Sequence, residues 1–154
     1  MTSLERICGA LRDAGVRYAV VGGYAVALHG AVRGTIDIDV ALPWSHQDLR
    51  AAEAALTEIG LVSRLPLTAH EVHAFRDEYI SERGLVAWNF YNPEDPSEQV
   101  DLVIAYDLTG KRTTTLELAG GPVQVLAVDD LIDMKRASGR PQDLEDAEAL
   151  ELLR

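Results

Sequence analysis

The spacing of hydrophobic and polar positions predicts helices near both ends of the chain and strands between them. Apolar side chains recur at helical spacing over residues 3–14, which predicts an amphipathic helix that Gly15 ends. A β-branched run over residues 17–21 then predicts a strand. Two glycines break this run, and the alanine and leucine content of residues 24–30 predicts a short helix.

The next third of the chain continues this order. Residues 36–42 alternate between apolar and acidic side chains, which is typical of a half-buried strand. Ser45 is suited to cap a helix over residues 46–59. The pattern is less regular after this helix, and we expect one further helix over residues 70–82.

The second half is predicted to hold the remaining strands and two final helices. A loop with two prolines is expected over residues 92–98, between the first two of these strands. Gly120, Gly121 and Pro122 indicate a hairpin between the next two. The predicted strands span residues 85–91, 99–105, 113–118 and 123–128, and the predicted helices span residues 129–138 and 141–153.

This order of elements predicts an α+β fold with a mixed central sheet flanked by helices. The chain has 154 residues, 47% of them hydrophobic, which suits a single domain over residues 1–154. The 25 acidic and 14 basic residues give a net charge of -11, which argues against extensive binding of long nucleic acids. A local basic site stays compatible with this balance.

Cysteine usage and the apolar runs bear on the compartment. Cys8 is the only cysteine, so no internal disulfide forms, and a cytoplasmic location is expected. The first residues lack the pattern of a secretion signal. The longest nearly apolar run, residues 18–32, is too short to span a membrane, so no membrane association is predicted.

Two acidic residues on one predicted strand are the first candidate for chemistry. Asp37 and Asp39 are two residues apart, so a strand places both side chains on the same face. Two adjacent carboxylates repel each other unless a cation lies between them, and their hard oxygen atoms suit Mg²⁺ or Mn²⁺. A lone Asp-x-Asp is also typical of a solvent-facing acidic stripe, so this pair needs further support.

Support comes from two glycines and a third acid. Gly22 and Gly23 lie where a strand meets a helix, and backbone without a Cβ can approach a phosphate closely. Asp101 is the one acid within an otherwise apolar strand. If this strand neighbours the one with Asp37 and Asp39, three carboxylates meet at one end of the sheet, where they could hold two metal ions for phosphoryl or nucleotidyl transfer.

The segment "VVGGYAVALHGAVRGTIDIDV" resembles the signature of the DNA polymerase β-like nucleotidyltransferase superfamily. The signature has an apolar residue, Gly-Gly or Gly-Ser, a spacer, Asp-x-Asp and a later single acid. Among its branches, the segment resembles the minimal nucleotidyltransferases, which include AbiEii-type toxin proteins and lincosamide or aminoglycoside nucleotidyltransferases. The tail "DLIDMKRASGRPQDLEDAEAL" resembles a family ending in which a helical lysine precedes Arg-x-x-Asp-x-x-Asp. The resemblance covers residues 16–42 and 84–150.

The resemblance implies a polymerase β palm-like fold and a role for six residues. Three acids would hold two Mg²⁺ or Mn²⁺ ions, and the third of them would also act as, or orient, the base. The two glycines would cradle the β- and γ-phosphates, although many relatives have serine at the second. The lysine would neutralise charge on the triphosphate. In this order the residues are Asp37, Asp39, Asp101, Gly22, Gly23 and Lys135.

The activity implied is transfer of a nucleoside monophosphate from an NTP, assumed to be ATP, to an acceptor hydroxyl with release of pyrophosphate. The acceptor alternatives are a small molecule such as an antibiotic, a protein, or a tRNA 3′ end, and the acidic charge disfavours extensive RNA contact. Toxin–antitoxin pairing would add an antitoxin or a helical partner protein. The alternative class is a catalytically silent module that binds a nucleotide or a partner.

Several residues of the matched segments keep two interpretations. Arg33 either contacts a phosphate or is a surface arginine. Asp143 and Asp146 share a helix face, where they either position Lys135 or Arg140 or form a solvated acidic surface.

Overall fold

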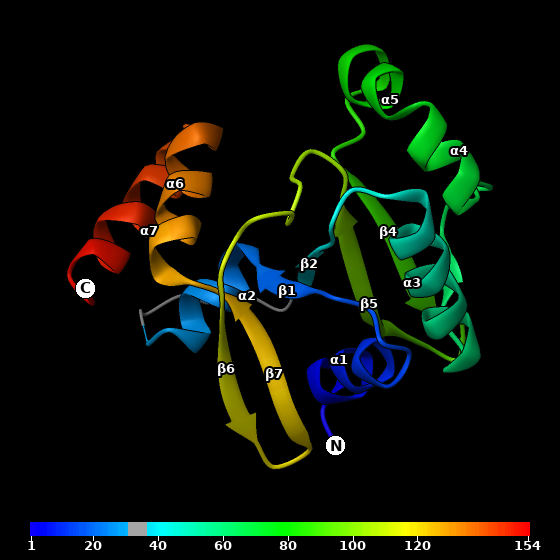
Figure 1. Ribbon diagram of the computed structural model, residues 1–154, viewed down its shortest axis with the longest axis horizontal. Helices are drawn as coiled ribbons and strands as arrows, with labels where there is room; N and C mark the ends of the chain where they lie inside the picture. Colours follow the sequence, from blue (N-terminus) through cyan, green and yellow to red (C-terminus); the bar gives the residue numbers. More distant parts are fainter. Residues whose placement is uncertain (31–36) are drawn as a thin grey trace.

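A seven-stranded mixed sheet forms the centre of the computed structural model, which describes residues 1–30 and 37–154 (Figure 1). Its strand order is β3-β4-β5-β2-β1-β7-β6. The strands are β1 (Ala19–Val21), β2 (Asp39–Ala41), β3 (Val62–Ser63), β4 (Ala87–Asn92), β5 (Asp95–Val103), β6 (Thr113–Leu118) and β7 (Gly121–Leu126).

Both strand directions occur in this sheet. The β1/β7 and β2/β5 pairs are parallel, and the other neighbouring pairs are antiparallel. Because β1 and β2 are antiparallel neighbours, the end of β1 and the start of β2 lie at the same edge of the sheet. The predicted α+β class with a mixed central sheet is therefore confirmed.

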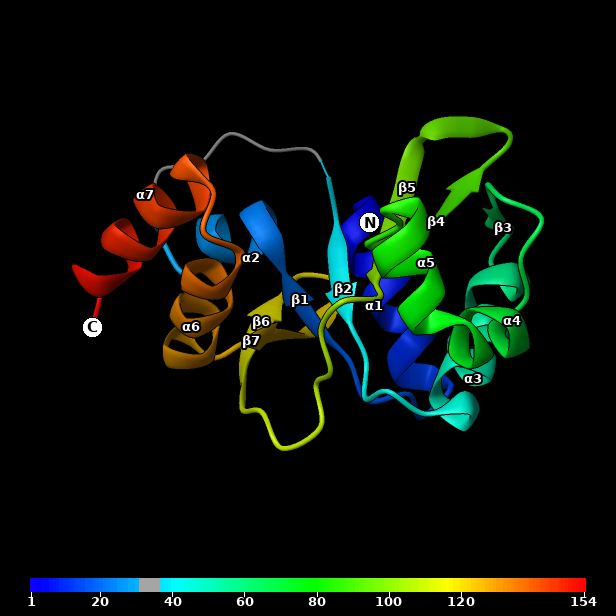
Figure 2. The ribbon, with the colours of Figure 1, turned by 90° about the horizontal axis from the view of Figure 1, so that it is seen from above.

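Helices gather on two sides of the sheet, as Figures 1 and 2 both show. The α6/α7 pair lies on one side, whereas α3, α4 and α5 lie on the other, and α1 contacts both β5 and β7. The helices are α1 (Ser3–Asp13), α2 (Gly22–Leu28), α3 (His46–Glu58), α4 (Ala69–Ala74), α5 (Arg76–Arg83), α6 (Val128–Ser138) and α7 (Pro141–Glu151).

The core forms where the apolar faces of these elements meet. Ile7 and Leu11 of α1 are fully buried, as the helical spacing predicts. All of β1 is buried, which fits a strand with neighbours on both edges. Trp88 and Phe90 are also buried, with ring centroids 4.6 Å apart, so they pack the sheet.

The predicted loop over residues 92–98 is wrong. The strand β4 continues to Asn92 and β5 begins at Asp95, which leaves a two-residue turn. The Asn92 side chain accepts a hydrogen bond from the backbone N–H of Glu94, as in an Asx-turn. Pro96 is tolerated near the start of β5, where the pairing register shifts.

Other element boundaries also differ from the prediction. The helix expected over residues 70–82 is interrupted at Phe75, where the side chain of Arg76 turns to donate a hydrogen bond to the carbonyl of Ile104. The strand β3 was not expected, because two residues are too few for a periodic pattern. The two glycines after β1 form the first turn of α2 instead of preceding it.

Candidate active site

Two acids face each other across neighbouring strands. Asp39 of β2 pairs with Asp101 of β5 in parallel register, and the backbone N–H of Asp101 donates a 2.9 Å hydrogen bond to the carbonyl of Ile38. Residues opposite each other in a sheet direct their side chains to the same face. The two carboxylates therefore lie side by side, as the sequence predicts for neighbouring strands.

A glycine backbone lies directly against one of these carboxylates. Val21 pairs with Asp39, and Gly22 is the next residue. A Cβ at Gly22 would come closer than 3.0 Å to an Asp39 carboxylate oxygen, a separation that real Cβ atoms essentially never show. Gly22 also has a φ of +69°, in the left-handed region. Both the close approach and the backbone angle therefore require glycine here.

The charges around Asp39 act in both directions on its pKa. Burial first, then the carboxylates of Asp101 and Asp37, raise this pKa to about 6. The cations of Lys135 and Arg140 lower it. The two cations therefore do not fully offset the free-energy cost of ionising Asp39. A further cation bound at the two carboxylates would lower this cost.

Asp37 precedes β2, so the strand itself contains only the second acid of the Asp-x-Asp pair. Its side chain is exposed, and its charge still reaches Asp39. Within the described ranges, 1–30 and 37–154, no three His, Cys, Asp or Glu side chains are arranged to hold a metal ion. The structure thus brings two of the three predicted acids together and places the third nearby. Arg33 lies outside the described residues.

A hydrogen-bond relay fixes Asp101 from the side of β4. Asn89 pairs with Asp101 across the antiparallel strands and donates a 2.8 Å hydrogen bond from Nδ2 to Oδ1. The same amide donates to Gln99, and its oxygen accepts a hydrogen bond from Nε of Arg64. Sequence reasoning missed Asn89. The sequence does contain one indication of a functional face. Asn89 is a polar residue between the two buried aromatic residues of β4, so its side chain points to the opposite face of the strand.

Lys135 lies in a buried ion-pair network on α6 and α7. Its Nζ is 3.1 Å from an Asp146 oxygen and 3.5 Å from an Asp143 oxygen. Arg140 pairs with Asp143 at 2.8 Å. The exposed fractions of Asp143 and Asp146 are 2% and 3%, so the interpretation as a solvated acidic surface is wrong. These acids hold the two cations, which was the other interpretation.

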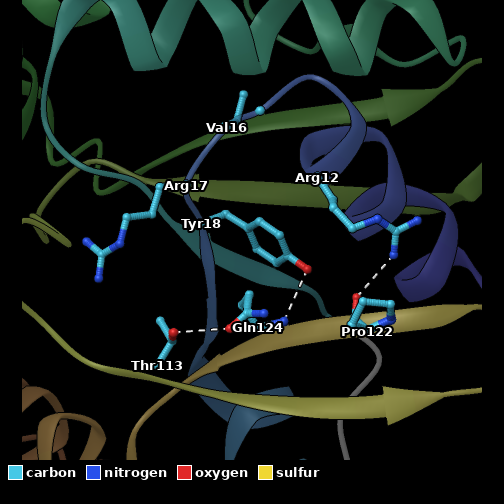
Figure 3. A pocket seen from close by; sticks show the side chains of 8 residues that line it. Arg12, Val16, Arg17, Tyr18, Thr113, Pro122 and Gln124 are labelled. Carbon is cyan, nitrogen blue, oxygen red and sulfur yellow. Dashed lines mark hydrogen bonds between the residues drawn. The ribbon is translucent and has the colours of Figure 1, made fainter.

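A separate pocket of about 280 Å³ lies at the far end of β1, beside the residues that precede the strand (Figure 3). Figure 3 shows the Tyr18 hydroxyl accepting a hydrogen bond from the backbone N–H of Gln124. Arg12 donates a hydrogen bond to the carbonyl of Pro122. Arg17 donates hydrogen bonds to two carbonyls in the loop that precedes β6. Both arginines of this pocket hold neighbouring backbone segments together, and the pocket lies at the opposite end of β1 from Gly22.

The donor set at the end of β1 and the start of β2 is suited to a hard divalent cation. Two adjacent carboxylates supply oxygen ligands, and the backbone of Gly22 lies directly against one of them. Mg²⁺ commonly takes one or two protein carboxylates and completes its coordination with water and phosphate oxygens. The geometry therefore fits chemistry on a metal-bound polyphosphate.

Comparison with known families agrees with this geometry. Residues 10–154 match the sequence model of a family described as nucleotidyltransferase of unknown function (DUF6036). The chain belongs to this family. A search of curated proteins found no significant match to this nucleotidyltransferase.

No helix in the described part of the chain is long and apolar enough to cross a membrane.

Solved structures share the nucleotidyltransferase fold at low sequence identity. An antigenic nucleotidyltransferase-like protein from Paracoccidioides brasiliensis aligns with a TM-score of 0.60 and 18% identity, over 96% of this chain and 72% of that protein. The antibiotic-resistance factor ANT(2'')-Ia aligns in its solution structure with a TM-score of 0.58 and 17% identity, over 99% and 87% of the two chains. Its crystal structure with adenylyl-2''-tobramycin gives a TM-score of 0.55 and 18% identity, over 96% and 90%.

Proposed function

We propose that this nucleotidyltransferase moves a nucleoside monophosphate from an NTP to an acceptor hydroxyl in a reaction that needs Mg²⁺ or Mn²⁺. The observation that carries the proposal is the pairing of Asp39 with Asp101 beside the backbone of Gly22. Family membership supports the transfer, and the carboxylate pair supports the metal requirement. ATP is the assumed donor, and one domain over residues 1–154 is the assumed unit.

The metal site would be formed by Asp39 and Asp101, with Asp37 joining them from the segment before β2. Two Mg²⁺ or Mn²⁺ ions bound there would stabilise the charge that develops on the attacking and leaving oxygens. The raised pKa of Asp39 supports this assignment, because burial and neighbouring carboxylates favour a cation at the same place. The close approach of Gly22 supports it as well, since a side chain there would collide with the Asp39 carboxylate and displace it.

The residues of the chain would orient the two substrates for in-line attack. The acceptor oxygen forms a bond to the α-phosphorus, the bond from that phosphorus to the β-phosphate oxygen breaks, and pyrophosphate leaves. Asp101, held by Asn89, accepts the hydroxyl proton or orients the group that accepts it. The backbone of Gly22 and Gly23 would border the β- and γ-phosphates, and the ion-pair network that contains Lys135 and Arg140 would supply positive charge beside them.

The acceptor is proposed to be a small molecule or a protein. The adenylyl-tobramycin complex of ANT(2'')-Ia supports a small-molecule hydroxyl by analogy of fold alone. The net charge of -11 disfavours a tRNA acceptor, which would need a basic surface. A protein acceptor would fit a toxin–antitoxin pair, in which case expression without the partner should slow growth. A reducing cytoplasm fits the single buried cysteine.

The test is transfer of label from each α-³²P-labelled NTP, with Mg²⁺, to components of a cell extract. Relative to the extract alone, one of the four α-labelled NTPs should label an additional acceptor, and the γ-labelled form of that NTP should add label only to pyrophosphate. Asp39→Asn should reduce transfer at least about 100-fold. Asp13→Asn is the matched control, because this aspartate is 77% exposed on α1. Absence of label from every NTP would contradict the proposal.

A catalytically silent nucleotide-binding module is the second candidate. The observation that favours it is the absence, among the described residues, of a three-ligand metal group. Such a module would bind an NTP without releasing pyrophosphate. If the wild type binds an NTP but no acceptor becomes labelled, this candidate is favoured over the enzyme.

A further inference from the structure

Arg140 presents an exposed cation that is held in a fixed orientation. Its side chain is 78% exposed, whereas that of Asp143 is 3% exposed. Nε donates a 2.8 Å hydrogen bond to Oδ2 of Asp143, and Nη2 donates to Oδ1 at 3.4 Å. A guanidinium has five N–H donors, so these two bonds orient the group and leave donors for a second anion.

The backbone on both sides of Arg140 is also constrained. Gly139 ends α6 with a φ of +70°, and Pro141 begins α7 directly after Arg140. A residue before proline favours the extended region, and Arg140 has φ -70° and ψ 154°. The side chain therefore starts from a fixed point between the two helices.

Lys135, in contrast, is enclosed by its own partners. Its side chain is 9% exposed, and both Asp143 and Asp146 contact its Nζ. Gln142 donates a 3.0 Å hydrogen bond to the other oxygen of Asp146. Two carboxylates already balance the lysine charge in a buried setting, where an unbalanced charge would be costly.

The helix pair packs against the helix whose first residue borders the Asp39 carboxylate. The helix α7 contacts α2, whose first residue is Gly22, and Gly22 adjoins Asp39. The α6/α7 pair and α2 lie on the same side of the sheet centre in Figures 1 and 2. The pKa of Arg140 is raised first by its hydrogen bond and ion pair with Asp143, and the charge of Asp39 adds to this. The charge of Arg140 in turn opposes the rise that burial and the neighbouring carboxylates cause in the pKa of Asp39, so the two charges act on each other.

We propose that Arg140 is the side chain that contacts the terminal phosphates of the donor NTP, and that Lys135 is a positioning residue. Lys135 holds Asp143, and Asp143 holds the guanidinium of Arg140. A planar fork that is already oriented suits a phosphate better than a lysine with two carboxylates around it. This inference rests on the proposed function of the site.

The first experiment measures the affinity for Mg²⁺-tripolyphosphate by calorimetry, because this probe has no base or sugar. Arg140→Gln should weaken binding about 10- to 100-fold. Arg140→Lys should have an intermediate effect, since lysine keeps the charge but cannot form the fork with Asp143. Arg136→Gln is the matched control, because Arg136 lies on α6, is 53% exposed and pairs with Glu151.

A double variant separates the two cations. Lys135→Met with Asp146→Leu removes one positive and one negative buried charge and keeps the Arg140–Asp143 pair. Replacing a buried ion pair with apolar side chains of similar volume is often tolerated, so this variant should fold. It should lose about threefold in affinity, because Asp143 loses one of the two cations that hold it while its pair with Arg140 stays. A larger loss than that of Arg140→Gln would overturn the inference.

The outcomes distinguish this inference from the proposed function. If the wild type binds Mg²⁺-tripolyphosphate and Arg140→Gln binds it equally well, Arg140 makes no phosphate contact and only the present inference fails. If the wild type binds neither this probe nor any of the four Mg²⁺-NTPs, the proposed function fails and the inference fails with it. Direct use of Lys135 would appear as a selective loss in the double variant.

Discussion

Gly22 and Asp39 are in contact at the point where β1 passes into α2. The Asp39 carboxylate occupies the place that a Cβ at Gly22 would need, and Gly22 has a φ that favours glycine. A glycine in a phosphate-binding signature is usually explained by the ligand. Here the position of the Asp39 carboxylate already requires glycine at residue 22. The same glycine is therefore needed both by the fold and by the candidate site.

We predict that Gly22→Ala destabilises the protein more than the same substitution at a glycine with a similar φ but no close neighbour. Gly15→Ala is the matched control, because Gly15 has a φ of +72° and nothing lies within 4 Å of an added Cβ. The control should cost about 1–2 kcal/mol of unfolding free energy. Gly22→Ala should cost about 1–3 kcal/mol more, because Asp39 must move. Equal values from urea unfolding would show that the close approach has no energetic weight.

Asp39→Asn should stabilise the metal-free protein while it reduces the proposed nucleotidyl transfer at least about 100-fold. Burial and the carboxylates of Asp101 and Asp37 raise the pKa of Asp39 from 3.8 to about 6, so the folded protein binds a proton more tightly than the unfolded chain. Wild-type stability should therefore fall as the pH rises through this interval. At pH 8 the variant should gain about 1–3 kcal/mol.

Urea unfolding of the metal-free protein at pH 4.5 and pH 8 checks this expectation. The variant should lose less stability than the wild type between the two values. Asp13→Asn, on the exposed side of α1, should follow the wild type. A variant that is less stable than the wild type at pH 8 would mean that the Asp39 carboxylate is favourably paired in the absence of metal.

Asn89→Ala should slow nucleotidyl transfer more than it weakens NTP binding. The variant removes the 2.8 Å hydrogen bond that fixes one oxygen of Asp101. Hydrogen bonds to charged groups contribute about 1.5–3 kcal/mol, so a loss of about 10- to 100-fold in kcat is expected. Gln99→Ala is the control, since it removes another partner of the same amide and leaves the bond to Asp101 in place. A change confined to KM would contradict a role in orienting Asp101.

The meeting of Asp39 with Asp101 could be predicted because each acid interrupts an apolar strand. The hypothesis still depended on the two strands being neighbours, and the register is set by tertiary pairing. Asn89 could not be singled out in the same way. Its importance comes from lying opposite Asp101 on the adjacent strand, and sequence spacing within β4 carries no information about that partner.

The helical tail shows a similar limit. The spacing of Asp143 and Asp146 places them on one face of a helix, but a solvated acidic face has the same spacing. The deciding partner, Lys135, lies on the preceding helix, so its contact depends on how α6 packs against α7. The hairpin at residues 92–95 was missed for a local reason, because prolines predict a loop and the Asn92 side chain closes a tight turn instead.

The last prediction concerns pH and His46, at the start of α3. The rings of His70 and His73 on α4 lie near it, with centroids 5.4 Å and 5.8 Å away. Burial first, then the charges of His70, Arg50 and His73, lower the pKa of His46 below its usual 6.5. The unfolded chain therefore binds a proton more readily than the folded protein. This contribution to stability is complete above pH 6.5 and is lost as the pH falls below it.

His46→Gln should consequently reduce the loss of stability between pH 7.5 and pH 5. Thermal unfolding at both values measures the difference for the wild type and the variant. Glutamine does not titrate in this pH range. The buried Nε2 of His46 has no hydrogen-bond partner among the described residues, so the substitution breaks no hydrogen bond at that atom. His29→Gln is the control, because His29 contacts the carbonyl of Leu126 at a site remote in the chain from α4. An unchanged pH dependence in His46→Gln, with the control also unchanged, would show that protonation of His46 does not oppose folding.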